Sequence, residues 1–363
     1  MRDSVAAALN VRSENVKIDH WRLSPGQRST RCWGTSLGKR FFAKTLALDP
    51  YRLVPRVAVP GKEAVANGNS CRSASEQIEA EWSMTQRLRK LVGNEAVPAP
   101  LGKSIATKTV VWEQATGARM DDSVRRSRWM DHRGNAGGAA LFQAGSWLKK
   151  LHNASAHREA AINCGELIRG VRELLQSQGL SSSGYASTAL QLLETARHRT
   201  GGNDLLMPTV LSHGDFTLAN MLWDKKASHL WIVDFEDFAE RTPLHDLVTI
   251  IFDLRVLLLN PFVSRLVIRR LEKSFWEGYG NLSPEMLIWV NALACSRIFY
   301  YSLPRLSGRQ ARRGWLAAGM VSVYKLLLEP SMIDRCLSQD FPPALNSAEL
   351  SVVPSSNALR MPH

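Results

Sequence analysis

The chain has 363 residues, of which 45% are hydrophobic, and a formal net charge of +13 at pH 7. This length and hydrophobic content predict two lobes with ordinary cores and exclude a string of small domains. The five cysteines form no C-x-x-C pair, so the sequence indicates neither a zinc site nor a disulfide framework and favours a reducing compartment.

The hydropathy of the chain leads us to expect a cytoplasmic protein. Residues 1–20 carry charges throughout and contain no apolar core, so no secretory signal is expected. The most apolar stretch, 244–271, is interrupted by aspartate, arginine and proline residues. These interruptions exclude an intact membrane span there.

Three strands are predicted close to the N-terminus, at residues 16–23, 31–35 and 40–46. The segment 24–30 between the first two contains serine, proline and glycine and is typical of a turn. In the third strand, alternation puts Phe42, Lys44 and Leu46 on one face. These patterns predict a small β-sheet.

A loop insertion and a helix are expected next. Residues 50–75 contain several prolines and glycines, which indicate an irregular segment. A helix is predicted from about Ser75 to Leu91, with Ser75 as its cap. A buried strand at 109–112 and a connection at 113–117 follow.

The C-terminal part is predicted to be mostly helical, with helices at about 139–152, 165–177 and 185–198. Residues 134–138 are rich in glycine and are expected to form a flexible break. His152 closes the first of these helices. We expect it to be structural, because such a histidine more often donates a hydrogen bond than performs acid–base chemistry.

The most informative stretch is 211–237. His213-Gly214-Asp215 is followed five residues after the aspartate by Asn220, and the apolar run 230–233 leads into Asp234. Phosphoryl transfer uses a base aspartate at this spacing from a metal-binding asparagine, and a second metal-binding aspartate that begins a D-F-G-like turn. The alternative is that Asp215 is only a turn residue and Asn220 only a helix cap. Turn and cap chemistry, however, requires no further acid after an apolar strand, and Asp234 is such an acid.

This stretch resembles the catalytic core of the aminoglycoside phosphotransferase and choline kinase family of small-molecule kinases, through its H-G-D-x-x-x-x-N loop and the segment Val233-Asp234-Phe235-Glu236-Asp237. The resemblance implies a protein-kinase-like, two-lobed α+β fold. A small antiparallel-sheet N-lobe is expected over residues 1–116 with the insertion at 50–75, and a mostly helical C-lobe over 117–338. Residues 339–363 are rich in proline and small polar residues and are expected to be a disordered tail.

The resemblance also implies roles for individual residues. Asp215 would be the catalytic base, and Asn220 and Asp234 would bind Mg²⁺. Lys44 lies at the strand position whose lysine pairs with the nucleotide phosphates, although a lysine on a strand is otherwise a solvated edge residue. Glu81 is the preferred partner of Lys44. Two neighbouring acids on the same predicted helix remain alternatives, Glu76 and Glu79.

Further binding and supporting residues follow from the same resemblance. The phosphates would be covered by a loop containing Gly26 and Ser29, and the adenine edge would meet the backbone of the hinge residues Glu113, Gln114 and Ala115. His213 and Asp246 would support the catalytic loop, Asp246 by accepting backbone hydrogen bonds. Glu236 replaces the glycine of the D-F-G turn and would either lie near a second metal or face water.

We therefore expect an ATP- and Mg²⁺-dependent phosphotransferase, with GTP as an alternative nucleotide. The acceptor would be a hydroxyl of a sugar, amino alcohol, antibiotic, or glycan or lipid precursor. Between residues 255 and 330, eleven lysine and arginine residues outnumber four acids, which favours an anionic or neutral acceptor and allows peripheral membrane contact through 262–276. The plain alternative is that these arginines cover helix exteriors.

Two other classes of protein remain as alternatives. A catalytically inactive kinase-like scaffold would be expected to lose at least one of Lys44, Asp215, Asn220 and Asp234, and all four are present. A basic membrane-binding or nucleic-acid-binding protein would explain the charge. Because no nucleic-acid recognition motif occurs in the sequence, no nucleic acid is expected as a partner. The sequence does not predict the oligomeric state.

Overall fold

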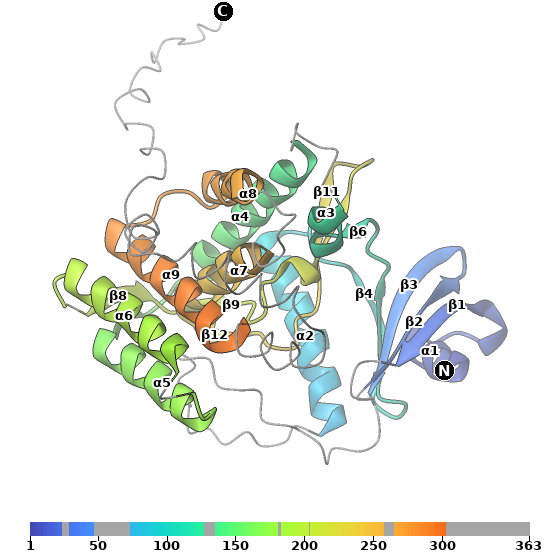
Figure 1. The fold of residues 1–363 in the computed structure, drawn as a ribbon. Coiled ribbons are helices and arrows are strands. Elements are labelled where there is room, and N and C mark those ends of the chain that lie inside the picture. The colour runs from blue at the N-terminus through green and yellow to red at the C-terminus, as the bar shows by residue number, and fades with distance from the viewer. Residues whose placement is uncertain are drawn as a thin grey trace, which may run out of the picture.

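The computed structural model describes seven stretches of the chain: residues 1–23, 29–46, 73–126, 135–180, 183–202, 204–257 and 265–302. Gly26, the predicted insertion up to residue 72 and the predicted tail lie outside them. Two lobes lie side by side (Figure 1). The described part up to Glu113, here called the N-lobe, is built on a sheet, and the part from Gly117 onward, the C-lobe, is mostly helical. The predicted two-lobed α+β fold is confirmed.

The N-lobe sheet has five antiparallel strands in the order β1-β2-β3-β5-β4. Its strands are β1 (Val16–Leu23), β2 (Ser29–Ser36), β3 (Lys39–Leu46), β4 (Pro100–Ser104) and β5 (Thr109–Glu113). Helix α1 (Arg2–Leu9), which the sequence analysis did not predict, covers one face of the sheet. Its residues Val5, Ala6 and Ala8 are buried in the same cluster as Phe41 and Ala43 of β3.

The opposite face of the sheet looks toward the C-lobe. Arg31 pairs across the strands with Lys44, and Trp33 pairs with Phe42, so all four side chains lie on this face. Helix α2 (Ala74–Val92) packs at one end of it. We call this surface the cleft face of the sheet.

The cap of α2 differs from the prediction. Ser73 caps the helix, not Ser75: the Glu76 N–H donates to Ser73 Oγ at 3.2 Å, and the Ser73 N–H donates to the Glu76 carboxylate at 2.7 Å. This reciprocal S-x-x-E capping box satisfies two backbone donors at once. Ser75 offers no such pairing, because residue 78 is an isoleucine.

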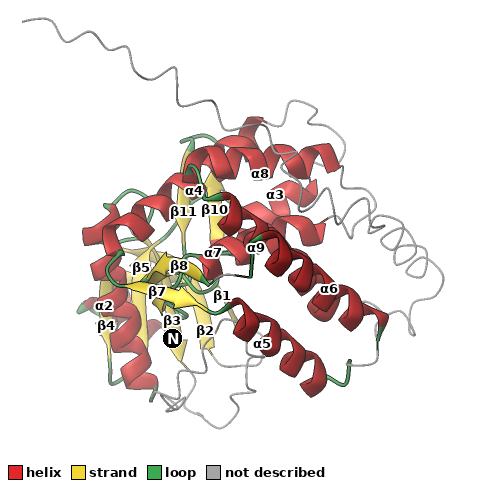
Figure 2. Ribbon diagram, turned by 90° about the vertical axis from the view of Figure 1, so that its left-hand side faces the viewer, coloured by secondary structure: helices red, strands yellow, loops and turns green. Residues whose placement is uncertain are grey.

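Helices make up most of the C-lobe (Figure 2). They are α3 (Met120–Arg126), α4 (Asn135–Ser155), α5 (Cys164–Ser177), α6 (Gly184–Arg199), α7 (Leu244–Val256), α8 (Arg265–Tyr279) and α9 (Pro284–Arg297). Short antiparallel strands lie among them: β6 (Ala118–Arg119) with β10 (Met221–Asp224) and β11 (His229–Ile232), β7 (Glu159–Ile162) with β8 (Leu205–Pro208), and β9 (Val210–Ser212) with β12 (Ala239–Arg241). Within the described residues, no helix combines the length and apolar character needed to span a membrane.

Residues 135–138, predicted as part of a flexible break, form the first turn of α4 instead. The small residues of α4 allow α4 and α8 to approach backbone to backbone. A Cβ atom on Gly145 would lie 2.2 Å from the carbonyl oxygen of Phe275, and one on Gly278 would lie 2.0 Å from that of Phe142. Glycine in this helix therefore serves packing, which outweighs its low helix propensity.

A buried ion pair joins α7, α8 and α9. The guanidinium of Arg255 donates to Glu272 at 2.8 and 3.1 Å and to Asn291 Oδ1 at 2.7 Å. The side chains of Arg255 and Glu272 are only 9% and 5% exposed. Arg255 belongs to the basic residues counted above in favour of an anionic acceptor, and its burial removes it from that surface.

We expect Glu272→Ala to lower the free energy of unfolding by about 3–5 kcal/mol, because it leaves the buried Arg255 without its carboxylate. Glu277→Ala, on the same helix, removes an exposed carboxylate that lies 3.6 Å from Lys273 and should cost less than about 1 kcal/mol. Denaturant unfolding of both variants measures the difference. Equal losses would show that the Arg255–Glu272 pair does not hold the three helices together.

Candidate active site

The predicted catalytic loop begins in the C-lobe at the end of β9. It is anchored by Asp246, which lies in the first turn of α7. Asp246 accepts hydrogen bonds from Ser212 Oγ and from the N–H groups of His213 and Gly214, all at 2.9 Å. The hydrogen bonds that the resemblance implied for Asp246 are thus present. They place the next residue, Asp215, on a fixed backbone.

Gly214 is required by the same geometry. Its φ is +81°, in the left-handed region, and a Cβ atom would lie 2.2 Å from the carbonyl oxygen of Asp237. The loop therefore lies directly against the turn that follows Asp234. Any residue with a side chain would push these two segments apart.

The Asp246 carboxylate is fully buried and is supported from behind by His152 and Tyr279. His152 Nε2 lies 3.2 Å from Asp246, and its Nδ1 lies 2.9 Å from the Tyr279 hydroxyl. Because a carboxylate only accepts, Nε2 carries a proton, and in the neutral ring Nδ1 accepts from Tyr279. Burial opposes ionisation of Asp246, but the hydrogen bond from His152 and the nearby ring of His245, whose Nδ1 lies 3.8 Å from Asp246, hold its pKa well below the usual value.

Asp215 and Asn220 are joined by direct contacts. Asn220 Nδ2 donates to the Asp215 carbonyl at 2.9 Å and to its carboxylate at 3.0 Å. The amide orientation is thereby fixed, so Asn220 Oδ1 is the atom that remains to bind a cation. The Val233 N–H donates to the Asn220 carbonyl at 3.0 Å, which links this loop to the strand that leads into Asp234.

Asp215 and Asp234 lie on the two turns that flank the buried His213. Burial lowers the pKa of His213, while the charges of Asp246, Asp215 and Asp234 act in the opposite direction, so all three carboxylates lie within electrostatic range of one ring. Asp234 itself has a φ of +69°, an unusual conformation for a residue other than glycine. Such backbone strain is typical of functional turns.

Lys44 is buried and lies between two carboxylates. Its Nζ donates to Glu81 at 2.9 Å and also contacts Glu236. The two alternative partners are engaged elsewhere: Glu76 in the capping box of α2 and Glu79 with Lys103. Of the three glutamates on this helix, the structure puts Glu81 against Lys44.

The contact between Lys44 and Glu236 was missed by the sequence analysis, which expected Glu236 near a metal or facing water. The two residues are 192 positions apart, and the packing of the two lobes against each other brings them together. The signal that could have found the contact is the acid at the third position of the D-F-G-like turn, within reach of the strand lysine.

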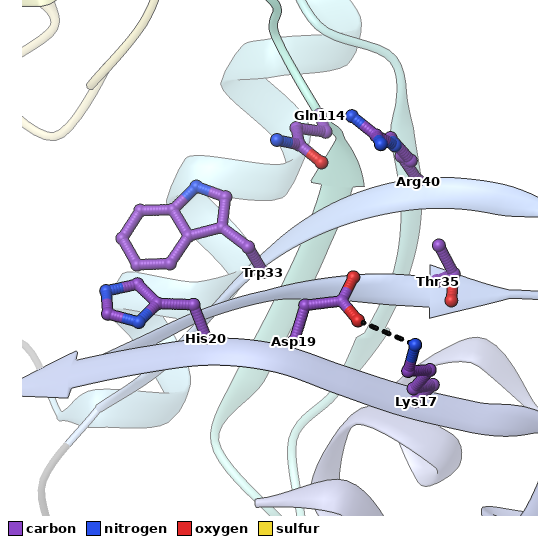
Figure 3. Close-up of a pocket in the computed structure, with 7 residues that line it drawn as sticks. All are labelled: Lys17, Asp19, His20, Trp33, Thr35, Arg40 and Gln114. Carbon is purple, nitrogen blue, oxygen red and sulfur yellow. Dashed lines mark ion pairs between the residues drawn. The ribbon is translucent and has the colours of Figure 1, made fainter.

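The cleft face carries a row of aromatic rings, here called the aromatic row and formed by His20, Trp33, Phe42 and Trp112. Neighbouring ring centroids are 5.5, 5.3 and 5.8 Å apart. Beside the row lies a pocket of about 620 Å³ (Figure 3), lined by Lys17, Asp19, His20, Trp33, Thr35, Arg40 and Gln114. Except for Phe42, which alternation placed beside Lys44, these rings were not anticipated as part of a site.

The predicted hinge lies at one wall of this pocket through Gln114. The Glu113 N–H donates to the Ala99 carbonyl at 2.8 Å, and the Gln114 N–H donates to the Arg40 carbonyl at 3.3 Å. These two donors are thus used within the N-lobe. Ser29 is buried at the start of β2, next to the residues that the structure does not describe.

The residues present fit a hard cation such as Mg²⁺. Asn220 and Asp234 offer an amide oxygen and a carboxylate, which Mg²⁺ prefers. No group of three or more histidine, cysteine, aspartate or glutamate side chains in the described ranges is arranged to hold a metal by itself. Phosphate and water oxygens would have to complete the coordination, as is usual for Mg²⁺.

Comparison with known proteins gives a family match that spans about two thirds of the chain. The model of the phosphotransferase enzyme family matches residues 46–283. No curated protein matches at a significant level.

Several solved structures are similar to this chain. An amicoumacin kinase in complex with AMP-PNP, Ca²⁺ and Ami is 13% identical, with 92% of each chain covered and a TM-score of 0.50. A spectinomycin phosphotransferase in complex with ADP and spectinomycin is 14% identical, with 89% of this chain and 92% of that chain covered and a TM-score of 0.46. A macrolide 2′-phosphotransferase from Brachybacterium faecium is 14% identical, with 85% and 92% covered and a TM-score of 0.47.

We expect Asp246→Asn to lower the free energy of unfolding at pH 7 by at least about 2 kcal/mol, because the loop N–H groups lose a charged acceptor. The folded-state pKa of Asp246 is depressed, so its contribution is complete above about pH 4 and is lost as the pH falls below that value. The difference between wild type and variant should therefore shrink from pH 7 to pH 3.

Denaturant unfolding at both pH values measures this difference, and Asp204→Asn, at an exposed position before β8, is the matched control. A gap between wild type and Asp246→Asn that stays constant down to pH 3 would contradict the stabilising role of the ionised carboxylate.

Proposed function

Because the chain belongs to the phosphotransferase enzyme family, we propose that it transfers the γ-phosphoryl group of ATP to a hydroxyl of a small molecule, with Asp215 as the base. One observation carries this proposal: Asp215, hydrogen-bonded to Asn220, and Asp234 flank the buried His213, while Lys44 paired with Glu81 faces them from the sheet. This is the set of groups that phosphoryl transfer requires.

Each residue has a distinct task in the proposed reaction. Asp215 orients the acceptor hydroxyl for in-line attack and takes its proton, and its hydrogen bond from Asn220 holds the carboxylate in place. Lys44, fixed by Glu81, pairs with the α- and β-phosphates. Asn220 and Asp234 hold Mg²⁺, with Glu236 as a nearby carboxylate. The metal ion, when bound, neutralises charge on the phosphate oxygens.

The nucleobase is proposed to lie against the aromatic row, beside the hinge. Stacking on Trp33 and Phe42 would bury one face of the base, and the pocket beside Gln114 provides the space. Since the N–H groups of Glu113 and Gln114 are used within the lobe, the base edge would meet the Glu113 carbonyl and the backbone of Ala115. The complex of a similar fold with AMP-PNP supports a nucleotide at this face of the sheet.

The acceptor is proposed to be a neutral or anionic hydroxyl compound. The basic excess of the C-lobe is smaller at the surface than the sequence indicated, because Arg255 is buried and Arg297 lies over the rings of Phe252 and Tyr301. Of the bases counted between residues 255 and 330, those that are exposed in the described part lie on α8: Arg269, Arg270 and Lys273. The similar fold of an amicoumacin kinase makes amicoumacin one of the first compounds to screen.

Asp215→Asn and Asp234→Asn test the assignment. Asp215→Asn should reduce phosphoryl transfer by about 10²–10⁴-fold, the usual contribution of a general base, and Asp234→Asn should reduce it to background. Labelled ATP with pooled sugars, amino alcohols, aminoglycosides and macrolides identifies the acceptor and gives the rates. Asp204→Asn is the control, and unchanged thermal unfolding shows that the variants are folded. Full transfer by either variant would defeat the proposed mechanism.

Phe42→Ala should raise the KM for ATP about tenfold with little change in kcat, because it removes a stacking surface that contributes about 1–3 kcal/mol per base. Trp21→Ala is the matched control, since Trp21 is an aromatic residue of the same sheet that is 60% exposed. Steady-state kinetics over a range of ATP concentrations gives both constants. A change confined to kcat would place the nucleobase elsewhere.

A further inference from the structure

Arg31 lies in the cleft in a position that the catalytic assignment does not use. It is the cross-strand partner of Lys44 and shares the cleft face with it. Its Nη2 is 4.0 Å from Asp234 Oδ2, which is beyond hydrogen-bond distance, and its buried Nε has no hydrogen-bond partner. A guanidinium with a buried, unsatisfied donor is unfavourable unless a ligand satisfies it.

Two cations of the sheet face two acids of one turn. Lys44 contacts Glu236, and Arg31 faces Asp234, two residues earlier in the chain. Lys44 is also held by Glu81, so it is shared between two carboxylates. A lysine shared between two carboxylates neutralises little of the negative charge of a triphosphate. The positive charge of Arg31 would therefore add to the binding of the phosphates.

From this geometry, and resting on the proposed function, we infer that Arg31 is a second phosphate-binding residue. Arg31, whose Nη2 lies 4.0 Å from Asp234, turns to a phosphate oxygen of the nucleotide once Mg²⁺ occupies Asp234. The side chains of Arg31 and Asp234 are 27% and 33% exposed, so solvent and ligand reach both groups. The planar fork of arginine suits phosphate oxygens, and its Nε–H is available for one of them.

Arg22 provides a useful contrast. It is the cross-strand partner of Arg31 on β1, but its guanidinium lies 5.2 Å from the centroid of the Trp33 ring, where it makes a cation–π contact. Among the arginines of these two neighbouring strands, Arg31 is the one that faces the acid proposed to bind the metal. A purely structural Arg31 would tie the lobes together and would affect stability, not the recognition of phosphate.

The test compares Arg31→Met with Lys39→Met, which removes the same charge from an exposed position of the same lobe. Calorimetric titration gives the Kd of AMP-PNP with Mg²⁺, and of adenosine, which lacks phosphates. Arg31→Met should weaken AMP-PNP binding about 10–100-fold and change adenosine binding less than about twofold. Lys39→Met should change neither. In Mg²⁺-free buffer the effect of Arg31→Met should shrink, because Arg31 then stays paired with Asp234.

Arg31→Lys provides a second variant that keeps the charge and loses the fork, and it should fall between wild type and Arg31→Met. Three results would overturn this inference and leave the proposed function standing. They are wild-type AMP-PNP affinity in Arg31→Met, equal losses of affinity for AMP-PNP and adenosine, and an effect of Arg31→Met that stays the same without Mg²⁺. A wild-type protein that binds neither AMP-PNP nor adenosine would overturn the proposed function and this inference together.

Discussion

The buried carboxylate of Asp246 is the constraint on which the site depends. A loop that approaches a reaction centre has backbone N–H groups without strand or helix partners, and burying them unsatisfied would be costly. Asp246 accepts from two of them and from the Ser212 hydroxyl. Its own charge is supported by His152 from α4, which Tyr279 from α8 holds in turn. The position of Asp215 is thus set by the packed core of the C-lobe.

Local patterns predicted the parts of this site that spacing encodes. The five-residue interval from Asp215 to Asn220 and the acid after an apolar strand are local features of one sequence, and they are the spacing that the proposed chemistry requires. The period-2 alternation of the third strand placed Lys44 on the same face as Phe42 and Leu46. In the structure, Glu81, the preferred glutamate, contacts Lys44. The cap of α2 was misplaced by two residues, because the reciprocal pairing of Ser73 and Glu76 outweighs the position of any single serine.

Tertiary contacts were beyond prediction from the sequence. Helix α1 is short and rich in alanine, and its position follows from the apolar back of the sheet that it covers. The pairing of Lys44 with Glu236 and the approach of Arg31 to Asp234 join segments about two hundred residues apart. The net charge of residues 255–330 overstated the basic character of the surface. Arg255 adds to the number of basic residues in the sequence, but it is buried and its charge is neutralised by Glu272. A charge count over a segment describes its surface only when the charges are exposed.

The cleft therefore has a specific electrostatic requirement. Its cations, Lys44 and Arg31, face its acids, Glu236 and Asp234. A simple anion would draw both cations away from these acids, whereas a lone metal ion would leave Arg31 without its acid and Lys44 with Glu81 alone. Either ligand alone gains one attraction and loses another, and the net gain is small. A metal–phosphate complex carries both charges in adjacent positions and satisfies both sets of residues. On the proposed function, these contacts would favour the binding of metal and phosphate together over the binding of either one alone.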